Sequence, residues 1–245
     1  MPVVSSATDA AELKLHAWRA YYGRQGPVNH ARALQLYGQA AALGDAEAQH
    51  VYGGMLYEGV GTKPDRAAGA AWLLKAAEQG YVSPESMAIV GRMYLHGQGV
   101  PQNYEEGRKW LTRAAEEGNM QAQNDLAYLY TRGLVDGQPD EEKALRLYEQ
   151  AAYQGDVSAQ ANTGIMYATG MGTEANPVRG YSWLSVAAGQ GHAGAAVHRN
   201  NLVLDMSWEE LNQAQALSLD LYRQVRQGKG SGRLAPAPQE PSASP

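Results

Sequence analysis

The chain has 245 residues, with 20 Lys and Arg against 25 Asp and Glu, and it contains neither cysteine nor phenylalanine. A formal net charge of −5 gives no electrostatic reason to expect a nucleic acid or an anionic membrane as a partner. The absence of cysteine excludes disulfides and thiolate metal sites. No apolar run approaches the roughly 18 residues of a membrane helix, and the first residues, M-P-V-V-S-S-A-T-D, lack the basic and apolar regions of a signal peptide. A cytoplasmic location is therefore expected, with a periplasmic one open if a leader has been removed.

Five segments of the chain have the pattern of a helix end, in which small residues are followed shortly by a glycine. The intervals between these glycines are 36, 38, 37 and 36 residues. Glycine is the preferred residue just after a helix because it adopts a left-handed backbone without strain. Internal repeats at such a period indicate a helical repeat protein. The five closing glycines are Gly44, Gly80, Gly118, Gly155 and Gly191.

The helix before each closing glycine carries two further recurring positions. Its predicted N-cap is Asn or Asp, whose side-chain oxygen accepts a free backbone N–H of the first turn. Seven residues later comes a Leu or Trp, which we expect to be buried between helices. The N-caps are Asn29, Asp65, Asn103, Asp140 and Asn176, and the large apolar residues are Leu36, Trp72, Trp110, Leu147 and Trp183.

Each unit also has an earlier helix, which ends in a glycine loop. A small residue recurs inside this first helix, and another recurs inside the second. Glycine inside a helix costs roughly 1 kcal/mol relative to alanine, so its repeated use predicts that two helix backbones pass very closely there. The first-helix positions are Ala17, Gly53, Gly91, Ala127 and Gly164, and the second-helix positions are Ala33, Gly69, Gly107, Ala144 and Gly180.

In chain order, the pattern predicts five helix–loop–helix units at about 10–44, 46–80, 84–118, 120–155 and 157–191. A C-terminal cap follows at 193–226, where Ser207 and Glu210 form a capping box for a last helix through about Arg226. We therefore expect one repeat domain over 9–226. Residues 228–245 are rich in Gly, Pro and Ser without periodicity, which predicts a disordered tail.

The motif is clearest from Val90 to Gly118, where V-G-R-M-Y-L-H-G-Q-G-V is followed by Asn103 and then W-L-T-R-A-A-E-E-G. It resembles the Sel1-like repeat, a relative of the tetratricopeptide repeat. The resemblance covers about four fifths of the chain, although Leu56 and Leu147 depart from it. It implies an all-α fold, a right-handed α/α superhelical solenoid whose first helices line a concave groove. Many proteins of this kind are bacterial scaffolds.

Residues that could carry catalysis are scarce. The loop Gly170-x-Gly172-x-x-Ala175 matches the dinucleotide fingerprint in its letters, but a helix and not a strand precedes it. The six histidines form no ligand-spaced pair, and no nucleophile elbow is present. We therefore expect no enzyme, no cofactor and no metal site.

Helical spacing selects the side chains that should face the groove. Such a side chain lies six or three residues before the recurring small residue of the first helix, or one, four or five residues after it. Tyr, Trp and Arg are enriched at binding hot spots. Alternatively, the first three aromatic residues seal a terminal repeat. The predicted binding residues are Lys14, Trp18, Tyr21, Tyr22, Glu47, His50, Tyr57, Glu58, Arg92, Leu95, His96, Gln121, Asn124, Tyr128, Thr131 and Arg132.

The sequence thus predicts a non-enzymatic adaptor or scaffold that binds another protein or a peptide segment through this groove. A dedicated inhibitor or immunity-type protein that occupies one enzyme or effector is the alternative. An enzyme or small-molecule binder is a third possibility, which no catalytic constellation supports. Neither the partner nor the oligomeric state follows from the residues.

Overall fold

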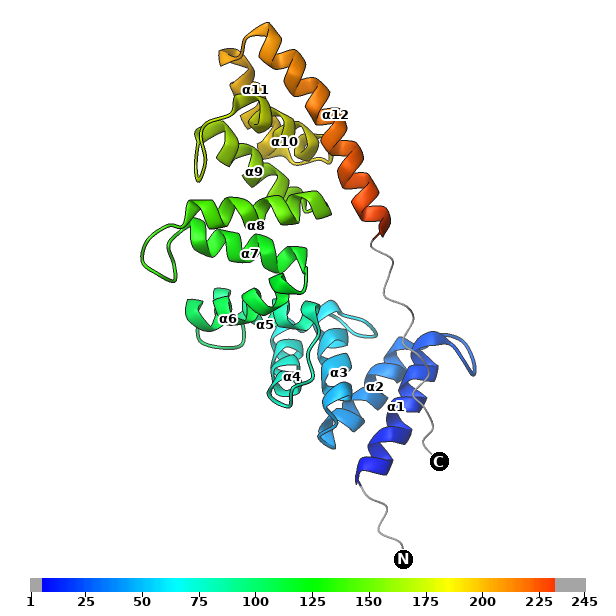
Figure 1. Cartoon of the computed structure of the whole chain (residues 1–245). Helices are drawn as coiled ribbons and strands as arrows, with labels where there is room; N and C mark the ends of the chain where they lie inside the picture. The colour runs from blue at the N-terminus through cyan, green and yellow to red at the C-terminus, as the bar shows by residue number, and fades with distance from the viewer. Residues whose placement is uncertain (1–5, 232–245) are drawn as a thin grey trace, which may run out of the picture. The chain divides into compact units, whose positions relative to one another are not determined.

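The computed structural model describes residues 6–231, and every regular element in that range is a helix (Figure 1). The prediction of an all-α repeat fold is confirmed, while the hand of the superhelix stays a prediction. The elements are α1 (Ser6–Tyr22), α2 (His30–Ala42), α3 (Ala46–Glu58), α4 (Arg66–Glu78), α5 (Pro84–His96), α6 (Tyr104–Glu116), α7 (Met120–Thr131), α8 (Glu141–Gln154), α9 (Val157–Thr169), α10 (Pro177–Gly189), α11 (Ala193–Leu202), the 3₁₀ helix η1 (Val203–Asp205) and α12 (Trp208–Ser231).

The helices form two compact units, and the boundary between them falls inside α6. Unit 1 contains the described residues up to Trp110, and unit 2 begins at Leu111. In unit 1, each helix from α1 to α5 packs against the next one along the chain (Figure 1). In unit 2, α7 packs on α8, α8 on α9 and α9 on α10 in the same way.

Side chains cap the second helices where the sequence predicts it. In each case the N-cap oxygen accepts from the backbone N–H three residues further on. The N···O distances are 2.9 Å at Asn29, 2.9 Å at Asp65, 3.1 Å at Asn103, 3.0 Å at Asp140 and 2.9 Å at Asn176. Such a cap stabilises a helix by about 1 kcal/mol, so the five together define where the second helices begin.

The first helices are capped as well, which the sequence analysis did not predict. Asp45, Ser83, Asn119 and Asp156 accept from backbone N–H groups at 2.7–3.2 Å. The equivalent position before α11 is His192, whose Nδ1 accepts from the N–H of Ala195 at 3.0 Å. Both helices of most units therefore have a chemically fixed start.

Close helix contacts occur at the recurring small residues, as predicted. A Cβ built on Gly53 would lie 2.8 Å from the backbone oxygen of Gly69, and one on Gly69 would lie 2.6 Å from the backbone nitrogen of Tyr57. A Cβ on Gly164 would lie 2.9 Å from the backbone nitrogen of Leu184. Real Cβ atoms essentially never come this close to backbone, so even alanine would force these helices apart.

The large apolar position of the second helix is less uniformly buried than predicted. Leu36 and Trp183 are buried, but Trp72, Trp110 and Leu147 are only half-buried. The Trp72 ring stands edge-on to the Tyr52 ring, and the Lys75 ammonium lies 4.1 Å from its centroid. Lys75 thus lies over a ring that is only half-buried by the fold.

Three buried glutamines connect consecutive helices. Nε2 of Gln49 in α3 donates to the carbonyl oxygen of Ala41 in α2 at 3.3 Å, and its Oε1 accepts from Nε2 of Gln79 at 2.7 Å. Two further glutamines each make the same two hydrogen bonds, one to a backbone carbonyl of the preceding helix and one to a second glutamine. These are Gln123 with Ala115 and Gln154, and Gln160 with Ala152 and Gln190.

The corresponding position in α5 is Met87, which is buried. Methionine has no amide to donate to a preceding helix. The α4–α5 junction is therefore held without the glutamine bonds that connect α2 to α4 and α6 to α10.

At the C-terminal end, α12 packs on α10 and α8, and its Ala214, Leu221 and Val225 are buried. The Ser182 hydroxyl donates to the Ala214 carbonyl at 2.9 Å. Ser207 and Glu210 form the predicted capping box. The helix does not end near Arg226 but continues to Ser231, and the rest of the predicted tail lies outside the described residues.

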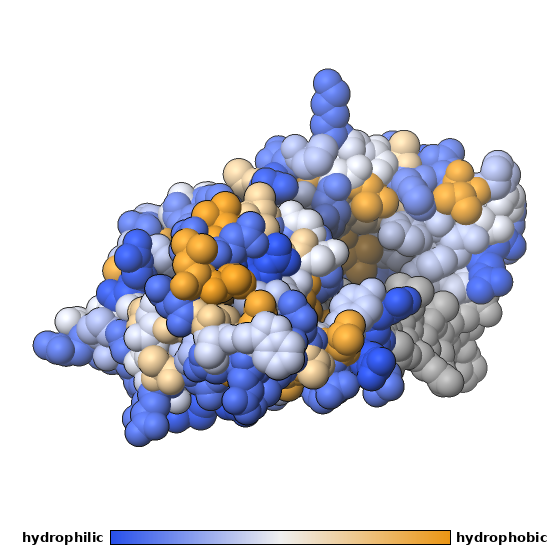
Figure 2. Space-filling model, turned by 90° about the horizontal axis from the view of Figure 1, so that it is seen from above, coloured by the Kyte–Doolittle hydropathy of each residue, from blue (hydrophilic) through white to orange (hydrophobic). Residues whose placement is uncertain are grey.

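The C-terminal helices do not present only polar residues outward. Leu204 is 82% exposed and Trp208 is 81% exposed. Figure 2 looks onto the side of α11 and the start of α12, and it shows a group of hydrophobic residues among hydrophilic ones. The cap therefore covers α10 but leaves apolar surface of its own.

Candidate functional site

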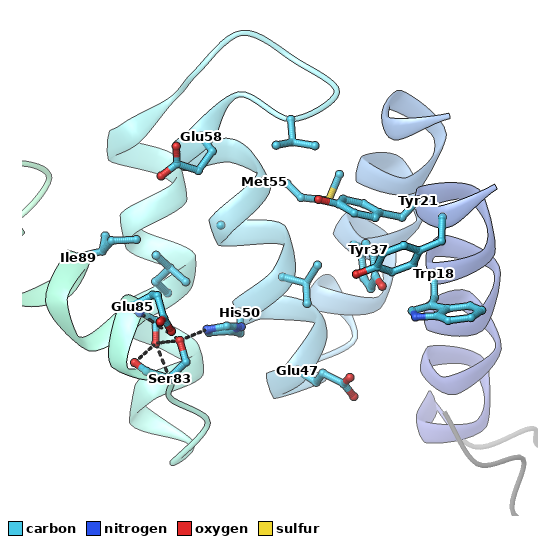
Figure 3. A pocket seen from close by; sticks show the side chains of 16 residues that line it. Trp18, Tyr21, Tyr37, Glu47, His50, Met55, Glu58, Ser83, Glu85 and Ile89 are labelled. Carbon is cyan, nitrogen blue, oxygen red and sulfur yellow. Dashed lines mark hydrogen bonds between the residues drawn. The ribbon is translucent and has the colours of Figure 1, made fainter. Parts of the chain in front are cut away.

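A hollow of about 450 Å³ lies within unit 1, between helices α1 to α5 (Figure 3). Pockets that bind ligands are usually about 300–1,000 Å³, so it can hold a large side chain and the backbone beside it. We call it the N-terminal pocket. It is lined by Trp18, Tyr21, Tyr22, Tyr37, Glu47, His50, Val51, Gly54, Met55, Glu58, Val60, Leu73, Ser83, Glu85, Ser86 and Ile89.

One wall of the pocket is aromatic. Trp18, Tyr21 and Tyr22 project from the end of α1, with ring centroids 5.3 Å apart for Trp18 and Tyr22 and 4.9 Å apart for the two tyrosines. Tyr37 adds a fourth ring from α2, and Figure 3 shows it beside Tyr21. Burial raises the pKa of Tyr37, so its hydroxyl stays protonated. The wall offers ring faces and neutral hydroxyl groups.

Trp18 has a double role in this wall. Its side chain is only 7% exposed, as expected of a residue that seals the terminal repeat, yet it also lines the pocket. The guanidinium of Arg24 lies 5.6 Å from its ring centroid. No described residue accepts a hydrogen bond from its indole N–H. The two predictions for this residue, sealing and lining, are therefore compatible.

The opposite wall is polar and comes from α3 and α5. Nε2 of His50 lies 3.3 Å from Oγ of Ser83, the N-cap of α5 (Figure 3). Burial lowers the pKa of His50, which the carboxylates of Glu85 and Glu47 only partly oppose. His50 is therefore neutral near pH 7 and adds no positive charge to the pocket.

Lys14 and Glu47 meet at the edge of this wall. Nζ of Lys14 lies 2.7 Å from Oε2 of Glu47 and 3.0 Å from Oδ2 of Asp45, which caps α3. The pKa of Lys14 is raised: burial alone would lower it, but the hydrogen bonds and charges of the two carboxylates prevail. This group links α1, which carries part of the aromatic wall, to the start of α3.

Gly54 gives the pocket its depth. It lies in the middle of α3, next to the tightly packed Gly53, but a Cβ built on Gly54 would meet no heavy atom within 4 Å. Because Gly54 also lines the pocket, the space above its Cα is part of the hollow. A larger side chain at this position would enter that space.

The structure brings together six of the predicted binding residues. Lys14 lies beside them through its bond to Glu47, whereas Tyr57, Arg92 and His96 are not part of the lining. The six are Trp18, Tyr21, Tyr22, Glu47, His50 and Glu58.

The prediction that Leu95 faces the groove is wrong. It is only 3% exposed, so it cannot form part of an open face. A Cβ built on Gly107 in the second helix of the unit would lie 3.3 Å from the backbone nitrogen of Leu95. Leu95 thus lies against the second helix of its own unit, whereas Tyr21, four residues after Ala17, lines the pocket. Tyr57 occupies the same position of its repeat and, like Leu95, lies against the second helix, at Gly69.

The remaining predicted residues of α7 lie in unit 2. Tyr128 is 41% exposed, and the guanidinium of Arg132 lies 5.8 Å from its ring centroid. The Thr131 hydroxyl donates to the Ala127 carbonyl at 2.8 Å. Asn124 is half-buried and Gln121 is exposed. Tyr128 and Arg132 are thus exposed enough to contact a partner.

Several pocket residues escaped the sequence analysis. Glu85 lies six residues before Gly91 and Gly54 lies one after Gly53, so the predicted register itself selects both. Tyr37 carried no such signal, because it belongs to a second helix. Ser83, the N-cap of α5, and Ile89, within α5, also line the pocket, and the spacing did not select either of them.

The described residues contain no group of three or more His, Asp or Glu side chains that could hold a metal ion. Within the same range, no helix combines the length and the apolar character needed to cross a membrane. The chemistry available in the N-terminal pocket is therefore that of rings, hydroxyls, carboxylates and one neutral imidazole.

Comparison with solved structures supports the repeat fold. A Sel1 repeat protein from Oxalobacter formigenes is 26% identical, with a TM-score of 0.62 over 87% of this chain and 89% of that one. A protective antigen of uropathogenic Escherichia coli with an SLR fold is 24% identical, with a TM-score of 0.59. That alignment covers 92% of this chain but 57% of the antigen, and it bears on the fold alone. No curated protein matches the chain.

The sequence profile of the family described as Sel1 repeat matches five segments, residues 16–45, 46–81, 84–119, 121–156 and 157–192. Together they cover well over half of the chain. Sel1 repeat proteins are generally non-enzymatic and mediate protein–protein interactions. On this match, the chain belongs to the Sel1 repeat family.

Proposed function

We propose that this protein is a non-enzymatic scaffold that binds a segment of another protein, and that the N-terminal pocket receives a side chain of that segment. Family membership supports the general role. The observation that carries the specific proposal is the open space over Gly54.

Gly54 is costly for the fold and has no packing reason. Glycine inside a helix destabilises it by roughly 1 kcal/mol relative to alanine. At Gly53, Gly69 and Gly164 the cost is explained, because a Cβ would collide with backbone. At Gly54 nothing would collide, so an alanine or leucine there would benefit the helix. Keeping the hollow open for a ligand explains the glycine.

The surroundings of Gly54 suit a protein segment. The rings of Tyr21 and Tyr22 supply rigid contact area on one wall, backed by the buried rings of Trp18 and Tyr37, and aromatic contacts of this kind are typical of hot spots in protein interfaces. Hydroxyls, His50 and Ser83 supply polar groups that can bond to a peptide backbone. The proposed partner therefore places one large side chain into the pocket and runs its backbone across the rim.

The test is a selection from a displayed random peptide library against the whole protein, followed by titration of the strongest peptide. Gly54→Leu is the blocking variant, since its side chain would enter the hollow. Gly189→Leu is the matched control: Gly189 ends α10, and a Cβ there also meets nothing within 4 Å. Both substitutions should keep or raise the melting temperature, because leucine is the better helix former.

We expect Gly54→Leu to weaken binding at least tenfold and Gly189→Leu to leave the dissociation constant unchanged. Equal affinity of the wild type and the Gly54→Leu protein would refute the proposal, as would the recovery of no peptide at all. Circular dichroism of each variant confirms that the helices are intact.

A further inference from the structure

We infer that the N-terminal pocket selects a positively charged side chain, preferably arginine, on the partner segment. This inference rests on the proposed function and names the chemistry of the ligand. It is carried by the charges and the rings that face the hollow.

The lining of the pocket is acidic. Among its sixteen residues are three carboxylates, those of Glu47, Glu58 and Glu85, and no lysine or arginine. Glu47 is paired with Lys14 at 2.7 Å. Glu58 and Glu85 form no salt bridge with any described residue, and both are exposed at the rim. A cation that enters the pocket would thus meet two carboxylates without a partner.

The aromatic wall suits the same ligand. A cation over the face of a tyrosine or tryptophan ring within about 6 Å is attracted by the ring quadrupole. This fold already uses the contact several times, for example between Arg66 and Tyr57 at 5.9 Å. In Figure 3 the side chains of Tyr21 and Tyr37 lie on one side of the hollow, and those of Glu58 and Glu85 lie on the other. A cation between the walls would be attracted by both.

Arginine fits this arrangement better than lysine. Its planar guanidinium stacks on aromatic rings and can donate to a carboxylate in a bidentate manner, whereas an ammonium acts as a compact point charge. Its aliphatic stem needs apolar contacts, which Met55, Val51 and Ile89 supply. An aspartate or glutamate would instead be repelled by Glu58 and Glu85.

The experiment uses capped peptide pools with no terminal charges, Ac-(X)₄-Z-(X)₄-NH₂, in which X is a mixture of neutral residues. The central residue Z is arginine, lysine, citrulline or glutamate, citrulline being the neutral analogue of arginine. Each pool is captured on the immobilised full chain and quantified. We expect at least tenfold more arginine pool than citrulline pool, an intermediate amount of lysine pool and the least glutamate pool.

The matching protein variant is Glu58→Gln/Glu85→Gln, which removes both free charges and keeps the side-chain shapes. It should reduce the arginine-to-citrulline ratio to below threefold. Glu78→Gln, an exposed glutamate at the end of α4 outside the lining, should leave the ratio unchanged. Raising the salt concentration should lower capture of the arginine pool, because exposed charges are screened.

The outcomes separate the inference from the proposed function. If Gly54→Leu abolishes capture but the arginine and citrulline pools bind equally, the pocket binds peptides and the charge preference is refuted. A ratio that survives Glu58→Gln/Glu85→Gln would refute the role of the two carboxylates. If Gly54→Leu captures the arginine pool as well as the wild type does, both the inference and the proposed function fall.

Discussion

The two units use one repeat framework, and one informative difference between them lies at a position of the first helix. The residue directly after the small residue is Gly54 in α3 of unit 1, and it leaves open space. In unit 2 the same position holds Tyr128 in α7 and Ile165 in α9, and Ile165 packs against the core cluster of Ala161, Leu184 and Ala187.

The hydrogen bonds of two tyrosine hydroxyl groups also differ between the units. In unit 2 the hydroxyl of Tyr167 donates to Oε1 of Glu149 at 2.6 Å and accepts from Nη1 of Arg179 at 2.7 Å. In unit 1 the hydroxyl of Tyr37 makes no hydrogen bond to any described residue. The Tyr167 hydroxyl is thus satisfied within unit 2, whereas the Tyr37 hydroxyl has no described partner in unit 1. The two units thus keep one repeat framework, while the position after the small residue is open in α3 and packed in α9.

The adjacent glycines of α3 give the sharpest contrast and the largest expected effect. Gly53→Leu should destabilise the protein by about 3 kcal/mol, the upper end for overpacking, because backbone atoms of Gly69 and Leu73 leave no room. At this chain length, that corresponds to a fall of roughly 6–12 °C in melting temperature. Gly54→Leu should not lower it. If the two variants have the same melting temperature, the proposed difference in packing between Gly53 and Gly54 is wrong.

The glutamine bonds of unit 2 come next in size. Gln160 is fully buried, so Gln160→Met leaves the Ala152 carbonyl and the Gln190 amide without this partner. An unsatisfied buried group costs about 1–3 kcal/mol, and the apolar methionine offsets part of that. We expect a net loss of about 1–2 kcal/mol in urea unfolding. If stability does not fall, a methionine such as Met87 in α5 stabilises this position as well as the glutamine does.

A pair of hydroxyl deletions tests whether the polar groups of the units differ as described. Tyr167→Phe should cost about 1 kcal/mol, because it removes two hydrogen bonds to charged groups in a partly exposed setting. Tyr37→Phe should change stability by less than about 0.5 kcal/mol, since its hydroxyl has no described partner. Chemical denaturation of both variants measures this. The reverse order would show that the Tyr37 hydroxyl is needed by the fold.

The smallest effect concerns His50. Its pKa is lowered from 6.5 by burial, against the opposing carboxylates of Glu85 and Glu47, with Ser83 and the Tyr81 ring as its other neighbours. The folded protein therefore binds this proton less readily than the unfolded chain does. The associated stability is fully present above pH 6.5 and is lost as the pH falls towards the lowered pKa.

Melts between pH 7.5 and 5.5 should show a larger decrease for the wild type than for His50→Gln. A titration followed by NMR gives the pKa directly. A value for His50 above 6.5 would contradict the environment described for the polar wall.

Local chemistry explains why so much of the fold could be predicted. Asn103 and Asp140 are recognisable caps because few residue types can accept a first-turn N–H, and Gly53 is recognisable because glycine inside a helix needs a reason. The same spacing led to Glu47, His50 and Glu58 in the pocket. These inferences depend only on helical periodicity and on residue chemistry.

The rest of the site depends on packing that spacing does not encode. Tyr37 lines the pocket from a second helix, which the spacing of the first helices does not select. Leu95 turns inward because the second helix passes so close at Gly107. A hollow is an absence of atoms, and several helices must be placed before it can be located.

The missing glutamine bond at the α4–α5 junction has a consequence for hydrogen exchange. Amide side chains connect α2, α3 and α4 into one bonded series, and α6 to α10 into another, while α5 carries Met87. Regions with fewer such bonds open as separate cooperative segments at lower free energy than global unfolding. We expect the backbone amides of α5 to exchange faster than those of α3 and α9. Because Ser83, Glu85 and Ile89 belong to the α5 side of the N-terminal pocket, such an opening would move part of the pocket lining and change the width of the hollow.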